Sequence, residues 1–122
     1  MQICQIYTIT AGTPINLATG TAAAPVKGQE IYAFDLSIQM QHGGTGRGYV
    51  MDGVPIGAAV LPTAVSPYLS YELAPATATA PGVNPYYKFV PQGQDRPGVN
   101  IHEIWIDGSN SGDTIIVSYN RK

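Results

Sequence analysis

Few side chains in this sequence combine the types and the spacing that chemistry requires. The two histidines, His42 and His102, lie far apart in the sequence, and neither belongs to a His-x-His or His-Glu-x-x-His pattern that would bind a metal. Cys4 is the only cysteine, which excludes an internal disulfide framework and a cysteine-based zinc site. We therefore expect no catalytic residue, no bound metal and no cofactor, and we expect that the protein is not an enzyme.

Two glycine-rich loops have the composition of ligand-binding loops. The loop at 107–113 places Asp, Ser, Ser and Asp at alternate positions, where they could surround a calcium ion, but it lacks the glutamate that closes an EF-hand loop. The loop at 44–48 has neither the spacing of a dinucleotide-binding fingerprint nor the Lys-Ser/Thr pair of a P-loop. Because turns prefer the same residue types, we interpret both loops as turns.

Aromatic side chains are the other groups that could bind a ligand. The chain has eight tyrosines and one tryptophan, Trp105, and exposed aromatic side chains on a β-sandwich can stack on sugars. Trp105 alternates out of phase with Ile104 and Ile106, and Tyr86 and Tyr87 stand in a loop-like stretch. We favour core packing or a subunit interface, because aromatic residues are enriched at interfaces. A sugar-binding surface is the alternative.

The composition bounds the class of protein. A chain of 122 residues has room for one domain with one core, and 44% hydrophobic residues are too many for a disordered chain. No apolar stretch approaches the roughly 18 residues that a membrane-spanning helix needs. A formal net charge of -2 without clustered Lys or Arg argues against nucleic-acid binding. Residues 1–5 lack the basic and apolar regions of a secretory signal, so we expect the chain to remain in the cytoplasm.

Charged residues are unusually scarce. They make up 11% of the chain, against about 25% in an ordinary globular domain. Like-signed charge is what usually keeps a small domain from self-association, and here too few charges remain to cover a free surface. We therefore expect partner subunits to cover much of the surface, as in a homo-oligomer such as a trimer.

Alternating patterns predict strands over most of the chain. Residues 34–40 alternate between apolar and polar side chains, and a glycine-rich loop and the apolar run 49–51 follow, which predicts a hairpin. Residues 101–106 and 114–119 flank the turn residues at 107–113 in the same way, which predicts a second hairpin. Further strands are predicted at 3–10, 56–61, 69–73 and 86–90.

Helix is nearly excluded, because ten prolines and fourteen glycines leave no window with a helical apolar pattern. We predict an all-β fold: a single β-sandwich or jelly-roll-like domain over residues 1–122, with Gly/Pro-rich loops and little or no helix. Two stretches stand outside the main strands. Residues 11–28 are expected to form an extended arm, and residues 74–98 a Pro/Tyr-rich loop insertion.

Four segments form a recognisable pattern. They are Leu-Ser-Ile-Gln at 36–39, Gly-Tyr-Val-Met-Asp-Gly at 48–53, Ile-Trp-Ile-Asp-Gly at 104–108 and Thr-Ile-Ile-Val-Ser-Tyr at 114–119. Over about residues 34–119, the pattern resembles the small β-sandwich virion proteins encoded among the head genes of tailed bacteriophages. The chain departs from that pattern by the insertion between its two blocks.

The resemblance implies a viral structural protein on the capsid surface of the virion, assembled in the host cytoplasm. Its role would be that of a capsid decoration or cement protein, many copies of which bind and stabilise the shell of the major capsid protein. The expected partners are the major capsid protein and further copies of this chain, with no nucleic acid and no membrane. The alternative function is a carbohydrate- or receptor-binding β-sandwich module of a virion.

We expect the docking contact in the stretch 74–97, with residues 11–28 as a second contact. Five prolines in that stretch withhold backbone donors, so it cannot form a central strand and should lie at the surface. Four apolar side chains there would cost free energy if left in water. We predict that they form the interface: Tyr86, Tyr87, Phe89 and Val90. The alternative is that they fold back and cap one end of the sandwich.

Overall fold

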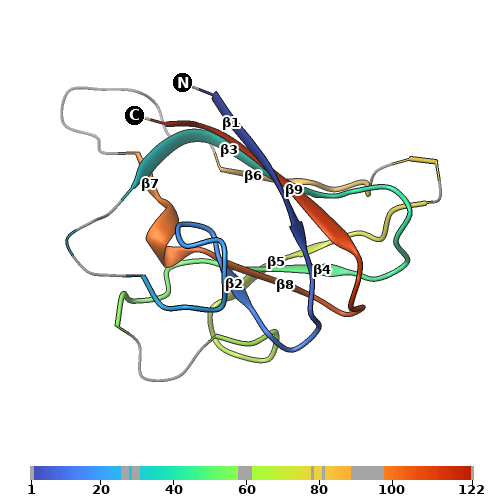
Figure 1. The fold of residues 1–122 in the computed structure, drawn as a ribbon, viewed down its shortest axis with the longest axis horizontal. Coiled ribbons are helices and arrows are strands. Elements are labelled where there is room, and N and C mark those ends of the chain that lie inside the picture. Colours follow the sequence, from blue (N-terminus) through green and yellow to red (C-terminus); the bar gives the residue numbers. More distant parts are fainter. Residues whose placement is uncertain are drawn as a thin grey trace.

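The computed structural model of this chain describes residues 2–25, 28, 31–57, 62–77, 79–80, 82–88 and 98–121. The regular structure of this part is almost entirely β, in two antiparallel sheets that pack face to face (Figure 1). The one helical segment among the described residues is a short 3-10 turn, η1 (Ile101–Glu103). The predicted all-β sandwich is therefore confirmed.

Each sheet draws strands from the whole length of the chain. The first sheet has the spatial order β1 (Gln2–Thr8), β9 (Thr114–Arg121), β3 (Tyr32–Met40) and β6 (Tyr86–Lys88), and β7 (Val99–Asn100) also pairs with β3. The second sheet has the order β2 (Ile15–Asn16), β8 (Trp105–Gly108), β4 (Gly48–Met51) and β5 (Leu69–Leu73). The strand pairs are nested along the sequence: β1 with β9, β2 with β8, β3 with β6, and β4 with β5. This nesting over two sheets is the jelly-roll arrangement.

Neither predicted hairpin is present. β3 belongs to the first sheet and β4 to the second, and in the same way β8 belongs to the second sheet and β9 to the first. Each of the two glycine-rich loops therefore carries the chain from one sheet to the other. The residues that permit a tight hairpin turn also permit such a crossover, so turn chemistry could not separate the two arrangements.

The two crossover loops lie against each other. The N–H of Gly46 donates a hydrogen bond of 2.8 Å to Oδ2 of Asp113, and the N–H of Arg47 donates one of 2.8 Å to Oγ of Ser109. A Cβ atom on Gly46 would lie 2.7 Å from that Asp113 oxygen, so a larger residue would push the loops apart. The loops thereby hold β3 beside β9 and β4 beside β8.

Residues 11–25 do not form the expected extended arm. They contain β2, which pairs with β8, and they are held by Asn16, whose side chain is completely buried. Its Nδ2 donates a hydrogen bond of 2.9 Å to the carbonyl of His102, while its Oδ1 accepts bonds from the N–H groups of Ala18 and Thr19. Because every polar atom of this buried amide has a partner, the segment is fixed to the sandwich.

The described part of the stretch 74–98 is not a loop throughout. Its β6 strand pairs with β3 at the edge of the first sheet, a position that the neighbouring prolines allow. The strands predicted at 3–10 and 69–73 are present as β1 and β5. Of the strand predicted at 56–61, residues 56 and 57 form a turn, and the others lie outside the described residues.

The core lies between the sheets, and a second apolar cluster lies outside them. The alternation predicted for 34–40 is confirmed, since Leu36, Ile38 and Met40 are buried between the sheets. A bulge at Asp35, which has a φ of 55°, shifts the pairing of β3 with β9. On the outer side of the second sheet, Trp105 packs with Met51 and Val54.

Candidate functional site

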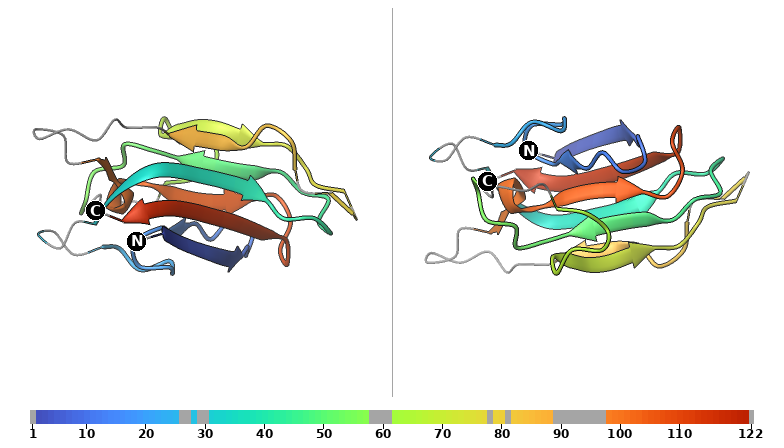
Figure 2. Two further views of the ribbon diagram at one scale, coloured as in Figure 1. Left: turned by 90° about the horizontal axis from the view of Figure 1, so that it is seen from above. Right: turned by 90° about the horizontal axis from the view of Figure 1, so that it is seen from below.

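The outer faces of the two sheets differ in what covers them. The described part of the connection between β4 and β5 crosses the outer side of the second sheet (Figure 2, right). Tyr68 of this connection packs against the cluster that contains Trp105, and Trp105 is only 3% exposed. No described segment crosses the outer side of the first sheet (Figure 2, left). Within the described part of the chain, the outer side of the first sheet is therefore an open surface, whereas the tryptophan that could have formed a sugar platform is buried.

The pairing of the strands identifies the side chains on this open surface. Ile115, Val117 and Tyr119 of β9 are buried, so the alternate residues of β9 point outward. Residues that oppose each other in an antiparallel pair share a face, which extends the set to β1, β3 and β6. We call these residues the uncharged face: Gln2, Cys4, Ile6, Thr8, Ser37, Gln39, Tyr87, Thr114, Ile116, Ser118 and Asn120.

The uncharged face carries small polar and apolar groups in rows across the strands. One row runs from Cys4 through Ser118 and Ser37 to Tyr87. The small side chains in its middle leave Tyr87 69% exposed at the end of the row. A hollow of about 280 Å³ lies beside this ring, and Asp35, Leu36, Ser37 and Lys88 line it together with Tyr87. The face therefore presents hydroxyl, amide and apolar groups.

Among the described residues, two charged side chains border this face, Asp35 and Lys88, and both line the hollow beside Tyr87. Asp35 stands at the rim, where its Oδ2 accepts a hydrogen bond of 3.2 Å from Nδ2 of Asn120. Arg47, the residue before β4, forms an exposed ion pair of 3.6 Å with Glu72 of β5, in the other sheet.

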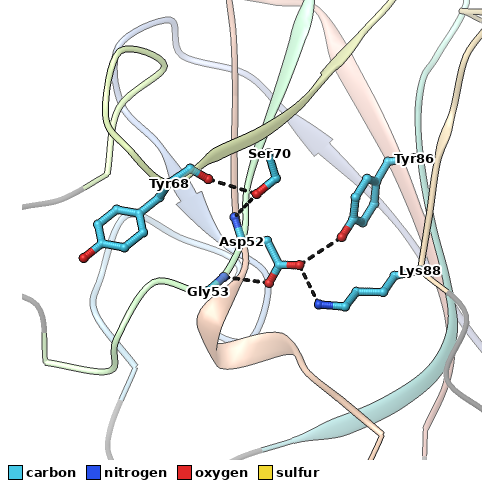
Figure 3. Close-up of polar contacts among 6 residues, drawn as sticks. All are labelled: Asp52, Gly53, Tyr68, Ser70, Tyr86 and Lys88. Carbon is cyan, nitrogen blue, oxygen red and sulfur yellow. Dashed lines mark hydrogen bonds and ion pairs between the residues drawn. The ribbon is translucent and has the colours of Figure 1, made fainter.

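Tyr86 points the opposite way from Tyr87, toward the second sheet. Its hydroxyl donates a hydrogen bond of 3.0 Å to Oδ2 of Asp52, the residue after β4 (Figure 3). Nζ of Lys88 lies 2.6 Å from the same oxygen, and the ring of Tyr86 packs against Tyr71, with 5.7 Å between the ring centroids. We call Asp52, Tyr86 and Lys88 the cross-sheet latch, because they join the edge strand β6 to the second sheet.

The electrostatics of the latch oppose a catalytic role for Tyr86. Burial of the hydroxyl, followed by the negative charge of Asp52 and the hydrogen bond to it, raises the pKa of Tyr86 well above its ordinary value. A tyrosine that acts as a base or nucleophile at neutral pH needs a lowered pKa. The same carboxylate is held by the N–H of Gly53 at 2.6 Å, so the cluster is a fully bonded structural contact.

Comparison of the chain with protein-family models, with curated proteins and with solved structures finds no match. The site must therefore be interpreted from its own geometry.

The other residues singled out in the sequence lie apart from the uncharged face. His42 is exposed in a turn, and His102 is buried, where its Nδ1 accepts a hydrogen bond of 3.0 Å from the N–H of Ile31. Phe89 and Val90, which were predicted with Tyr86 and Tyr87 as an interface, lie outside the described residues. Of the described pair, only Tyr87 is available to a partner, and the interface remains a prediction.

The oxygen atoms of the loop 107–113 are directed at neighbouring backbone. Asp107 Oδ1 accepts from the N–H of Gly108, and the Ser109 and Asp113 side chains accept from the crossover loop at 46–47. Within the part of the chain that the structure describes, no three His, Cys, Asp or Glu side chains gather as metal ligands would. Among those same residues, no helix has the length and apolar character to cross a membrane.

The uncharged face could not be located from the sequence. Its members come from four strands, and they share a surface only because β1 and β3 both pair with β9. The low charge of the whole chain was the one available signal that such a surface exists.

Proposed function

We propose that this protein is a viral structural protein: a capsid decoration, or cement, protein that binds the assembled shell of a major capsid protein and stabilises it. The observation that carries the proposal is the uncharged face, an open sheet surface of hydroxyl, amide and apolar groups. Burying such groups against a protein avoids the large desolvation penalty of buried charges.

Three further features support this function. The jelly roll is an architecture of viral capsid domains as well as lectin domains, although a fold alone does not assign a function. The sequence pattern over 34–119 resembles that of head-associated phage proteins. A protein that occupies many equivalent sites also gains from avidity, so a modest contact per copy can strengthen a whole shell.

The experiment mixes the purified protein with shells that lack it. We expect saturable binding and shells that resist heating better. Ser118 lies in the middle of the uncharged face, so Ser118→Lys should weaken binding strongly by burying an unpaired charge. The matched control is Val65→Lys in the β4–β5 connection, where Val65 is 94% exposed. Equal binding by both variants would refute this docking surface. No binding by the unaltered protein would refute this function.

A carbohydrate- or receptor-binding module of a virion is the second function that a specific observation favours. Tyr87 is 69% exposed beside the hollow of about 280 Å³, and an exposed aromatic ring can stack on a sugar. Titration of glycans against the isolated domain distinguishes the two functions. Saturable glycan binding that Tyr87→Ala abolishes, together with no shell binding, would favour this alternative.

A further inference from the structure

β1 differs from the other edge strands of the sandwich. The edges among the described strands are β1 and β6, with β7, in the first sheet and β2 and β5 in the second. β2, β6 and β7 have two or three residues each, β6 carries Lys88, and β5 carries Glu72. β1 has seven residues with neither a charge nor a proline. A short length or a charged side chain usually protects an edge strand from pairing with another chain, and β1 has neither.

The hydrogen bonds around β9 show which backbone groups of β1 face outward. The N–H of Gln41, next to β3, donates to the carbonyl of Thr114, so the even-numbered residues of β9 bond toward β3. The odd-numbered residues of β9 therefore bond toward β1. The bond from the N–H of Ile9 to the carbonyl of Asp113 agrees, because it joins two odd-numbered residues just beyond the paired strands. The outward N–H and C=O groups of β1 are consequently those of Gln2, Cys4, Ile6 and Thr8.

The sequence of β1 is a palindrome in polarity. Gln-Ile-Cys-Gln-Ile-Tyr-Thr reads polar, apolar, apolar, polar, apolar, apolar, polar, and its centre is Gln5. If two β1 strands run antiparallel about that centre, Cys4 opposes Ile6 and Gln2 opposes Thr8. Ile3 then opposes Tyr7, so like groups meet at every position. In this register, even-numbered residues oppose even-numbered residues, and these are the residues whose backbone N–H and C=O groups face outward. The register that the palindrome favours is therefore also one in which the two strands can exchange backbone hydrogen bonds.

We propose that two copies of this chain associate through β1, antiparallel, about a two-fold axis at Gln5. Cys4 of one copy then forms a hydrogen-bonded pair with Ile6 of the partner subunit, and the symmetry repeats this pair on the other side of the axis. Both strands are uncharged, so no like charges oppose each other across the contact. The contact closes with two copies, so the unit that it forms is a dimer.

The surroundings of β1 leave room for this contact. A groove of about 460 Å³ lies beside the strand, lined by Gln5, Ile6, Tyr7, Ala18, Thr19 and Gly20. Ile6 is 56% exposed in the single chain, and the pairing would cover it. The two first sheets would join into one sheet, with both uncharged faces on the same side, because the two-fold axis is perpendicular to the sheet. A dimer would thus present a doubled uncharged face.

Charged substitutions at positions 4 and 6 test the register in which the two β1 strands pair. Cys4 and Ile6 are both exposed, so charged substitutions there should leave the folding of each chain intact. Cys4→Lys with Ile6→Lys places two lysines opposite each other twice, and should raise the dimer dissociation constant by roughly a hundredfold. Cys4→Glu with Ile6→Lys changes the same positions but opposes opposite charges, and should retain the dimer. Sedimentation equilibrium in reducing buffer measures both variants, with Val65→Lys as the control.

A disulfide trap tests the position of the axis. Gln5→Cys in a Cys4→Ser background places two cysteines opposite each other in a non-hydrogen-bonded pair, with Cα atoms about 4.5 Å apart, and should give a covalent dimer on oxidation. Ile3→Cys in the same background places its cysteines ~13 Å apart across the axis, and should not cross-link.

Three results would overturn the proposal. The first is a monomeric unaltered protein at high concentration, and the second is equal cross-linking at positions 3 and 5. The third is a dimer that Ser118→Lys abolishes and the double-lysine variant tolerates, because it would indicate face-to-face contact. None of these measurements uses a capsid shell, so the dimer and the proposed function can fail independently.

Discussion

The hydroxyl of Tyr86, in the first sheet, donates a hydrogen bond of 3.0 Å to Oδ2 of Asp52, which follows β4 in the second sheet. Lys88 reaches the same oxygen from the same short strand, so all the polar bonds of this latch converge on one carboxylate. β6 has three residues and lies at a sheet edge, so its pairing with β3 alone would hold it weakly. The latch explains how this edge of the sandwich is closed.

Removal of the Tyr86 hydroxyl should weaken the fold by a small, measurable amount. Tyr86→Phe keeps the ring contact with Tyr71 but loses the hydrogen bond to Asp52, and should lower the free energy of unfolding by about 1 kcal/mol. Tyr87→Phe removes an exposed hydroxyl from the same strand and should change it very little. Urea unfolding at neutral pH measures both variants, and equally small effects would show that the hydrogen bond from Tyr86 to Asp52 contributes nothing to stability.

Ionisation of the same hydroxyl should lower the stability of the protein at alkaline pH. The pKa of Tyr86 is raised in the folded protein, first by burial and then by Asp52, so the phenol stays protonated after the unfolded chain has begun to ionise at about pH 10. Its contribution to stability is complete below that pH and falls as the pH rises further. Burial also raises the pKa values of Tyr7 and Tyr119, which add to this fall.

Tyr86→Phe provides the control for the alkaline effect. Unfolding free energies measured at intervals above pH 9 should decline less steeply for this variant than for the unaltered protein. Identical slopes would mean that Tyr86 ionises equally in the folded and unfolded states.

Serine substitutions at the two adjacent tyrosines should have opposite effects. Tyr87→Ser should weaken shell binding and change the free energy of unfolding by no more than about 0.5 kcal/mol, because the ring is exposed. Tyr86→Ser removes the hydrogen bond from Tyr86 to Asp52 and a half-buried ring, and should cost about 2 kcal/mol of stability. If Tyr87→Ser unfolded the protein and left shell binding intact, the docking surface would lie elsewhere.

Asn16 should be among the most sensitive polar residues. Asn16→Ala leaves the N–H groups of Ala18 and Thr19 and the carbonyl of His102 without this partner, and should lower the unfolding free energy by about 2 kcal/mol. Asn16→Asp keeps the acceptor but buries a charge that faces the carbonyl, so it should be at least as damaging at neutral pH. Thermal unfolding that is unchanged in both variants would show that β2 is not fixed by this amide.

Chelation should not affect folding. The side-chain oxygens of the loop 107–113 already accept backbone hydrogen bonds, as at Ser109 and Asp113. Thermal unfolding with EDTA and with added calcium should therefore give the same midpoint, because a ligand that binds only the folded state would raise it. A midpoint that falls on chelation would restore the calcium interpretation of this loop.

Local patterns predicted strands well and their partners poorly. The alternation at Leu36, Ile38 and Met40 identifies a half-buried strand because the side-chain period of a strand depends on the local backbone. The loops after β3 and β8 were predicted as hairpin turns, but each leads to the opposite sheet. Whether a turn returns along the same sheet depends on the partner that the next strand finds, and that partner is distant in the sequence.

The all-β class, the scarcity of charge and the palindrome of β1 can all be read from the printed sequence, because composition and period are properties of nearby residues. The inward direction of Tyr86, the outward direction of Tyr87 and the burial of Trp105 could not be predicted in this way, nor could the gathering of residues from four strands on one uncharged face. A strand fixes the alternation of its side chains, but long-range pairing sets which of its two faces is buried.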